Sequence, residues 1–121
     1  MVLIDLMLLS QHQTVVADVL FTPDILTDIV KVDHAVFLTT APELVRQDYF
    51  ARANKKDFYD CVMSLSDPTR TFENIFQTVE AVNRIGRERI QNGGYPKLER
   101  TANSVIEDTL AIIEGHFGLV R

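Results

Sequence analysis

Two short apolar runs, at residues 14–21 and 34–39, constrain the fold of this chain more than any other feature of its sequence. Both runs are rich in Val, Leu and Phe, and about a dozen residues join them. A join of that length is too long for a hairpin and long enough for a helical crossover. The two runs are therefore predicted to be parallel β-strands.

Helical patterns fill much of the remaining sequence. Residues 2–9 are apolar on nearly all sides of a helix apart from Asp5, a pattern typical of a helix buried inside a larger core. A turn is predicted at residues 66–68, and the longest helix is predicted to follow it and to end at residues 92–94. Its apolar residues three or four apart, from Phe72 to Ile85, form one stripe that is expected to be buried. A last helix is predicted over residues 106–117.

A third strand is predicted at residues 95–100. Pro96 places it at the edge of the sheet or begins it, because proline cannot donate a backbone hydrogen bond. Capping boxes at residues 40–43 and 104–107 predict that a helix follows the second and the third strand. Strands that alternate with helices predict one α/β domain over residues 1–121, a three-layer architecture in which helices cover a parallel sheet.

Composition and charge narrow the possible functions. A formal net charge of -5 argues against a nucleic-acid or anionic-membrane partner, because neutralising phosphates takes a basic surface. The apolar start of the chain contains Asp5, lacks a basic leader and is too short to span a bilayer, so we expect a buried helix there and not a signal or an anchor. Cys61 is the only cysteine, which excludes a disulfide framework and fits a reducing, cytoplasmic setting.

Asp18 is the sharpest candidate for a functional residue. It interrupts the first apolar run, where a carboxylate is costly unless it is paired, binds a metal ion or faces a crevice at the end of the strand. Val15-Val16-Ala17-Asp18 has the pattern of a Walker B acid, which holds Mg²⁺ usually through water. The pattern is short, and the alternative is an Asp at a frayed edge or bonded to a backbone group.

A basic group follows the second predicted strand and comprises Arg46, Arg52, Lys55 and Lys56. In one interpretation these residues belong to a mobile lid that closes guanidinium groups over phosphates. In the other they form a solvated helix face and pair at helical spacing with the aspartates among them. Spacing alone favours the solvated face.

The order of these elements resembles the C-terminal half of the P-loop small-molecule kinases of the shikimate, gluconate, adenylate and chloramphenicol-phosphotransferase type. In that family a Walker B-like strand is followed by a crossover, a strand that leads into a Pro-Glu helix start, a helical lid with arginines, a helix, an edge strand and a last helix. Residues 15–18 resemble the Walker B strand, which implies that Asp18 assists Mg²⁺ through water. Residues 35–43 (AVFLTTAPE) resemble the strand and helix start before the lid.

The resemblance implies an ATP-dependent, nucleotide-binding phosphotransferase that acts on a small molecule. Arg46 and Arg52 fall where the catalytic lid arginines are expected, in a lid-like segment over about residues 43–65. Arg100 and Thr101 fall in the loop that lies beside the adenine in the family. The phosphate acceptor stays open, because substrate contacts in such kinases come largely from the other half of the domain.

One diagnostic element of the family is missing. The motif G-x-x-x-x-G-K-[ST], which cradles phosphate and binds Mg²⁺, does not occur in the sequence. In the family its strand lies between the Walker B strand and the pre-lid strand, so its absence leaves unpaired backbone on both sides of a gap. We therefore expect ATP and Mg²⁺ to bind only when the missing N-terminal half is supplied, and no kinase activity from this chain alone. The chain is expected to lack that half, to pair its strand edges differently or to form a homo-oligomer.

A second hypothesis is a non-enzymatic α/β interaction domain that oligomerises through exposed sheet edges and the apolar N-terminal helix. The two hypotheses differ in whether Asp18 and the two lid arginines converge on one crevice at the carboxyl ends of the strands. A flavodoxin-like binding domain shares the layers but needs a phosphate-binding loop after the first strand. Thr22-Pro23-Asp24 is a poor candidate for that loop, because it is acidic and lacks glycine.

Overall fold

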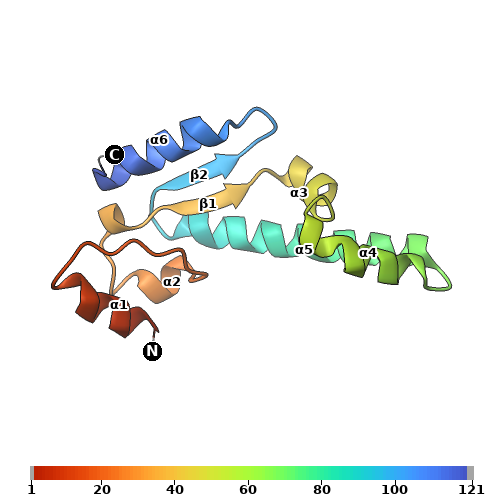
Figure 1. The fold of residues 1–121 in the computed structure, drawn as a ribbon, viewed down its shortest axis with the longest axis horizontal. Helices are drawn as coiled ribbons and strands as arrows, with labels where there is room; N and C mark the ends of the chain where they lie inside the picture. Colours follow the sequence, from red (N-terminus) through yellow and green to blue (C-terminus); the bar gives the residue numbers. More distant parts are fainter. Residues whose placement is uncertain (1, 120–121) are drawn as a thin grey trace.

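A parallel pair of strands lies at the centre of the fold. The computed structural model describes residues 2–119. Strands β1 (Phe37–Thr40) and β2 (Lys97–Arg100) pair in parallel, with Phe37 opposite Lys97 and Thr40 opposite Arg100. Both strands point toward the start of α3 (Pro42–Asp48), as Figure 1 shows. Within the described residues the fold is mixed but mostly helical, with this two-stranded sheet.

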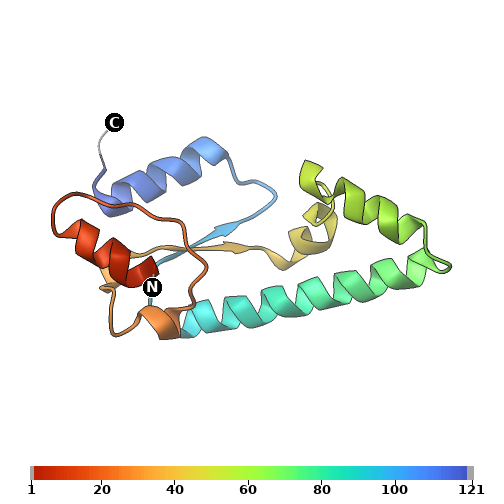
Figure 2. The ribbon, with the colours of Figure 1, turned by 60° about the horizontal axis from the view of Figure 1, so that its bottom comes forward.

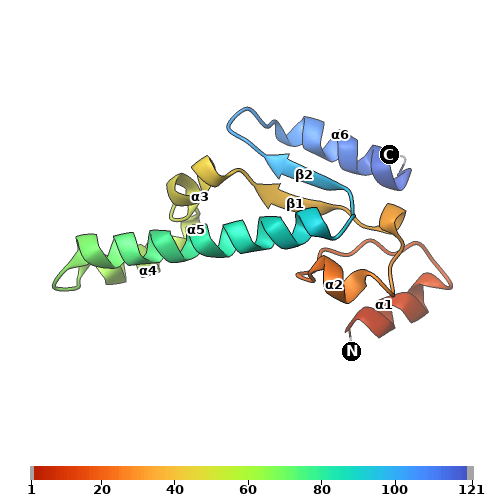
Figure 3. The ribbon, with the colours of Figure 1, turned by 180° about the vertical axis from the view of Figure 1, so that it is seen from behind.

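Helices surround the strand pair. The longest, α5 (Pro68–Asn92), leads into β2, and α6 (Ile106–Phe117) follows β2; the two helices lie on opposite sides of the strands (Figure 2). Helices α1 (Val2–Ser10) and α2 (Pro23–Leu26) lie together at one end of the molecule, and α4 (Lys56–Met63) lies along α5 at the other (Figures 1 and 3). Two short 3₁₀ turns, at Val32–His34 and Ala53–Lys55, complete the regular elements.

The prediction of a strand at residues 14–21 is wrong. This segment has no regular secondary structure and leads directly into α2. Leu20 is fully exposed and Val16 is 67% exposed. A strand needs backbone partners as well as apolar side chains, and no strand in the described part of the chain pairs with this segment. The predicted three-layer sheet is therefore not confirmed, because β1 and β2 are the only strands within residues 2–119.

The two predicted capping boxes are also wrong. Pro42 occupies the first helical position of α3, which makes Ala41 the N-cap, and Ala41 has no side-chain oxygen to accept a hydrogen bond. Thr40 instead ends β1, and its carbonyl accepts a hydrogen bond from Asn83 Nδ2 at 3.2 Å. Helix α6 likewise begins after Val105, without a side-chain cap.

The predicted long helix is confirmed as α5, which begins at Pro68, the last residue of the predicted turn. Asp67 caps its start by accepting a hydrogen bond from the backbone N–H of Arg70 at 3.2 Å. After its end, Gly94 adopts a φ of 76°, the left-handed conformation that glycine tolerates best. The predicted buried stripe is only partly confirmed, because Val82 is 65% exposed and Ile85 is 45% exposed.

Two small clusters hold the elements together. The first is apolar and lies near the chain start, where Leu3, Leu26 and Tyr95 are buried and Phe37 packs edge-on against Tyr95 with ring centroids 5.5 Å apart. The second is aromatic and joins α3, α4 and α5. In it the ring of Phe50 lies between 4.8 and 5.8 Å, centroid to centroid, from the rings of Tyr49, Phe58, Tyr59, Phe72 and Phe76.

The chain exposes more surface than a compact protein of its mass. Its accessible surface is 9239 Å², whereas a compact monomer of 13.7 kDa exposes about 6,600 Å². Large apolar side chains contribute to the excess, including Leu8, Leu38, Val82 and Ile106, each more than half exposed. The two clusters are therefore a small core for the length of the chain.

Gly93 and Gly86 offer a matched test of how closely α2 packs against α5. A Cβ at Gly93 would lie 2.2 Å from the Cβ of Pro23, whereas one at Gly86 would meet nothing within 4 Å. We expect Gly93→Ala to lower the free energy of unfolding by about 1–3 kcal/mol, because the extra methyl group overpacks the contact. We expect Gly86→Ala to raise it by about 0.5–1 kcal/mol, because alanine favours the helix.

Urea unfolding followed by circular dichroism measures both changes. If Gly93→Ala stabilises the chain as much as Gly86→Ala does, α2 does not pack on the end of α5, and the contact with Pro23 is contradicted.

Candidate functional site

A crevice lies where β1 and β2 end. It has a volume of about 220 Å³, and the last residues of the two strands, Thr40 and Arg100, both line it. Ligand crevices of open parallel sheets lie outside the carboxyl ends of the strands, as this one does. Helices α3 and α5 and the turn after α3 complete its walls, which comprise Thr40, Leu44, Val45, Asp48, Tyr49, Arg52, Lys55, Asn83 and Arg100.

Three cations and one carboxylate determine the charge of this crevice. Arg100 Nη1 donates a hydrogen bond to Asp48 Oδ2 at 2.7 Å. Lys55 Nζ lies 4.6 Å from the centre of the Tyr49 ring, within range of a cation–π interaction. The Arg52 side chain is exposed and forms no hydrogen bond or ion pair with any described residue. The crevice is therefore net basic, and its unpaired guanidinium is Arg52.

Local structure explains how these residues meet. Pro42 starts α3 immediately after β1, so Asp48 and Tyr49 follow within two turns. The turn that carries Arg52 is anchored by Phe50 in the aromatic cluster and reverses the chain. On the other wall, the hydrogen bond from Asn83 to the Thr40 carbonyl ties α5 to the end of β1.

Arg46, the other predicted lid arginine, does not line the crevice. Its Nε donates a hydrogen bond to Glu80 at 2.6 Å, and its two Nη atoms donate to the two carboxylate oxygens of Glu73 at 3.0 Å each. The guanidinium also lies 5.2 Å from the centre of the Phe76 ring. The bonds to Glu73, and then those to Glu80, raise the pKa of Arg46. Arg46 therefore ties α3 to α5, and it is not free to close over a ligand.

Asp18 lies outside the crevice. It is exposed, in the irregular segment that passes near α1 and α2 on the side where β1 begins (Figures 1 and 2). Among residues 2–119 there is no group of three or more His, Cys, Asp or Glu side chains placed to hold a metal ion. Asp18 therefore belongs to no such group among the described residues, and its part in holding Mg²⁺ stays a prediction.

Thr101 also lies outside the crevice. It directly follows Arg100, and its backbone N–H donates a hydrogen bond to Ser104 Oγ at 2.8 Å. The predicted site residues therefore divide into two groups. Arg52 and Arg100 meet at the crevice, whereas Arg46, Asp18 and Thr101 do not line it.

Sequence reasoning missed the role of Asn83. A signal for it was present, because Asn83 lies four residues after Val79 and seven before Ile90 and so shares the packed face of α5 with them. A polar residue on a packed face needs a hydrogen-bond partner. The Thr40 carbonyl, which is distant in sequence, is that partner.

No protein-family model matches this chain, and comparisons with curated proteins and with solved structures give no match. Among the described helices, none has the length and apolar character needed to cross a membrane.

The bonds of Arg46 predict that acid weakens the contact between α3 and α5. The hydrogen bond from Arg46, and after it the one from Gln77, lowers the pKa of Glu73 below that of an ordinary glutamate. The stabilisation is therefore complete above the unfolded-state pKa of about 4.3 and is lost as the pH falls through the lower folded-state pKa. We expect the free energy of unfolding to fall more steeply between about pH 6 and about pH 3 in the original chain than in Glu73→Gln.

Urea unfolding at a series of pH values tests this expectation. Glu107→Gln is the control, because Glu107 is an exposed carboxylate that forms no hydrogen bond with the described residues. It should keep the original pH dependence. Equal slopes for the original chain and Glu73→Gln would show that the Arg46–Glu73 contact does not contribute in solution.

Proposed function

We propose that this chain supplies the anion-binding part of a phosphotransferase-type α/β domain. The phosphates of a nucleotide or of a phosphorylated small molecule occupy the crevice at the ends of β1 and β2. The observation that carries the proposal is the convergence of Arg52, Lys55 and Arg100 on that crevice. Arg100 is far from Arg52 and Lys55 in the sequence. The three cations therefore meet because of the fold and not because they are neighbours along the chain. Arg52 and Arg100 also match the lid and the adenine-side loop in the kinase resemblance.

The chemistry of these side chains suits phosphate oxygens. A guanidinium donates paired N–H groups to phosphate, and an ammonium adds a compact positive charge. Arg52 has no partner within the described part of the chain, so an anion displaces only water from it. Arg100 gives one donor to Asp48, which leaves its other N–H groups for an anion. Asp48 holds the Arg100 side chain at the crevice in the absence of a ligand.

The proposal assigns binding to this chain and no phosphoryl transfer. Transfer in P-loop enzymes depends on a phosphate cradle and on Mg²⁺. The sequence has no G-x-x-x-x-G-K-[ST] motif, and Asp18 lies away from the crevice. We therefore expect the crevice to hold phosphate groups without hydrolysing them, and the phosphate acceptor stays open.

The free edge of β1 supports a larger parallel sheet in the whole domain. The N–H groups of Phe37 and Ala41 donate to carbonyls of the β2 segment, at Pro96 and Arg100. The backbone groups of Leu38, between them, therefore point to the opposite edge. No strand among the described residues pairs with that edge. In the kinase resemblance this is where the central P-loop strand lies, and its addition would extend the sheet toward the three-layer architecture.

The large accessible surface favours a second candidate function, a non-enzymatic domain that assembles with other polypeptides. The excess over a compact monomer is roughly 2,600 Å². Obligate interfaces bury about 2,000–5,000 Å², so an interface of that size would account for it. This candidate needs no ligand in the crevice, which separates it from the first.

Binding of inorganic pyrophosphate and of ATP, measured by isothermal titration calorimetry, tests the proposed function. The kinase resemblance implied that ATP binds only when the missing half is supplied, whereas the crevice leads us to expect that both ligands bind this chain alone through their phosphates. We expect Arg52→Gln or Arg100→Gln to weaken binding about tenfold or more, since a hydrogen bond to a charged group contributes about 1.5–3 kcal/mol. Arg84→Gln is the matched control: it removes the same charge from an exposed arginine of α5 that does not line the crevice. It should bind as the original chain does.

Two results would contradict the proposed function. One is the absence of pyrophosphate and ATP binding to the original chain. The other is an equal loss of affinity in Arg84→Gln and Arg52→Gln, which would show that the anions respond to overall charge and not to the crevice.

A further inference from the structure

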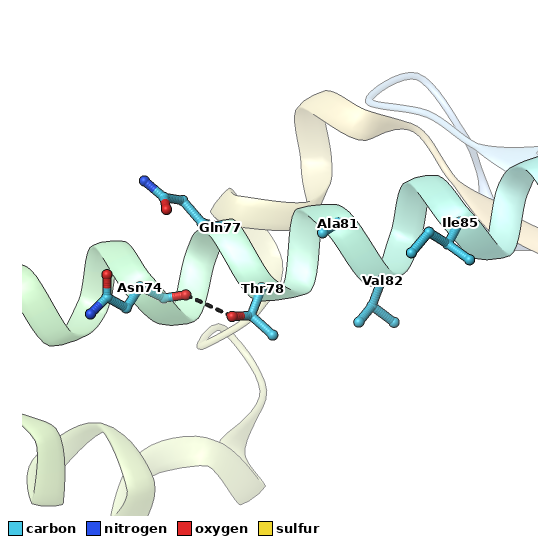
Figure 4. Close-up of a pocket in the computed structure, with 6 residues that line it drawn as sticks. All are labelled: Asn74, Gln77, Thr78, Ala81, Val82 and Ile85. Atoms are coloured by element: carbon cyan, nitrogen blue, oxygen red, sulfur yellow. Dashed lines mark hydrogen bonds between the residues drawn. The ribbon is translucent and has the colours of Figure 1, made fainter.

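The outer face of α5 carries a strip of side chains that nothing in the described chain covers. We define the α5 strip as Asn74, Gln77, Thr78, Ala81, Val82 and Ile85, which line a shallow open hollow of about 460 Å³. Figure 4 shows these residues along one side of the helix, with Gln77 and Val82 pointing to opposite flanks. Its polar residues lie toward the start of α5 and its apolar residues toward the end. Val82 and Ile85 are 65% and 45% exposed.

Two charged residues lie beyond the ends of the α5 strip. Arg70 and Glu88 are separated by 18 residues, which is five turns of a helix and about 27 Å. They therefore lie on the same flank, which Gln77 and Ala81 share. Both side chains are exposed, and neither forms a hydrogen bond or ion pair with another described side chain.

The electrostatics of α5 itself explain neither charge. The start of a helix favours anions and its end favours cations. Arg70 is a cation in the first turn of α5, and Glu88 is an anion near its end. Arg70 therefore lies where the helix dipole disfavours it, and Glu88, just before the last turn, gains no stabilisation from the dipole. A partner that presents an anion to Arg70 and a cation to Glu88, about 27 Å apart, would complement both.

We propose that the α5 strip binds the α5 strip of a second copy of this chain in an antiparallel, two-fold symmetric pair. In such a pair the same flanks of the two helices meet, and each residue faces the one equally far from the centre on the other side. Residues 70 and 88 are equally far from residue 79, and so are residues 77 and 81. One axis near residue 79 thus places Arg70 of each copy beside Glu88 of the other, and Gln77 beside Ala81.

The same axis determines which side chains of the two α5 strips meet. It places the apolar end of each strip, Val82 and Ile85, against the Thr78 and Asn74 end of the other. Small residues, Thr78 and Ala81, lie nearest the centre, where they let two helices approach closely. Among the other charges at that end, Arg87 pairs with Glu99. Arg89 interacts with Asp24 of its own chain, where the Thr22 hydroxyl and, less strongly, Arg89 lower the pKa of the Asp24 carboxyl.

This pairing is separate from the anion crevice. Phe76 and Asn83 contact α3 and β1 from the inner face of α5, whereas the α5 strip lies on the outer face. The two copies therefore leave both crevices open. Dimerisation and pyrophosphate binding are expected to respond to different substitutions.

Sedimentation equilibrium of the original chain over a wide concentration range tests the proposal. We expect a dimer of twice the 13.7 kDa chain mass, dissociation to monomers in Arg70→Glu and in Glu88→Arg, and recovery of the dimer in the Arg70→Glu, Glu88→Arg double variant. Each single variant places two like charges together at both ends of the pair, and the double variant restores opposite charges. Both substitutions suit the helix dipole, so the single variants should keep the circular dichroism and thermal midpoint of a folded chain.

Val82→Asp is expected to give a monomer as well, because it buries a carboxylate against the second helix. A monomeric original chain overturns the proposal. So does a dimer that persists in both single charge variants, or a double variant that stays monomeric, since either result would place the interface elsewhere.

Discussion

The parallel pairing of β1 with β2 is the constraint on which the rest of the structure depends. Two parallel strands cannot be joined by a tight turn, so α3, α4 and α5 form the connection between them. The register places Thr40 and Arg100 at the same end of the sheet. Because α3 begins at once after β1, its polar residues reach that end as well. The crevice, its basic charge and its position outside the strand ends all follow from this one pairing.

Helix α5 has two faces with different surroundings. Its inner face holds the connection in place, through the Arg46 bonds to Glu73 and Glu80 and through Asn83 at the end of β1. Its outer face is exposed and ends in two charges that the helix itself does not stabilise. The inner face of α5 contacts α3 and β1, whereas its outer face is exposed to solvent. This exposure is consistent with an accessible surface larger than that of a compact monomer. The proposed self-association therefore uses the face of α5 that lies away from the proposed anion site.

The main helices and the strands β1 and β2 could be predicted from the sequence, because periodicity, turn residues and prolines are local signals. The strand predicted at residues 14–21 does not form, because a strand depends on a neighbouring strand and the described chain provides none for this segment. Contacts between side chains distant in the sequence could not be predicted either. Arg46 pairs with Glu73 and Glu80, which lie 27 and 34 residues away in the sequence. Arg46 therefore does not line the crevice as the predicted lid arginine would. Arg52 and Arg100 were named as candidates from the resemblance, but their meeting at one crevice needed the strand register.

The register of the strand pair is the most direct test of this account. Backbone nuclear Overhauser contacts between residues 37–40 and 97–100 of the isotopically labelled chain report it. We expect a parallel network in which Phe37 lies opposite Lys97 and Thr40 opposite Arg100. An antiparallel network, with Phe37 opposite Arg100, would place Thr40 and Arg100 at opposite ends of the sheet. That result would remove the crevice and with it the proposed anion site.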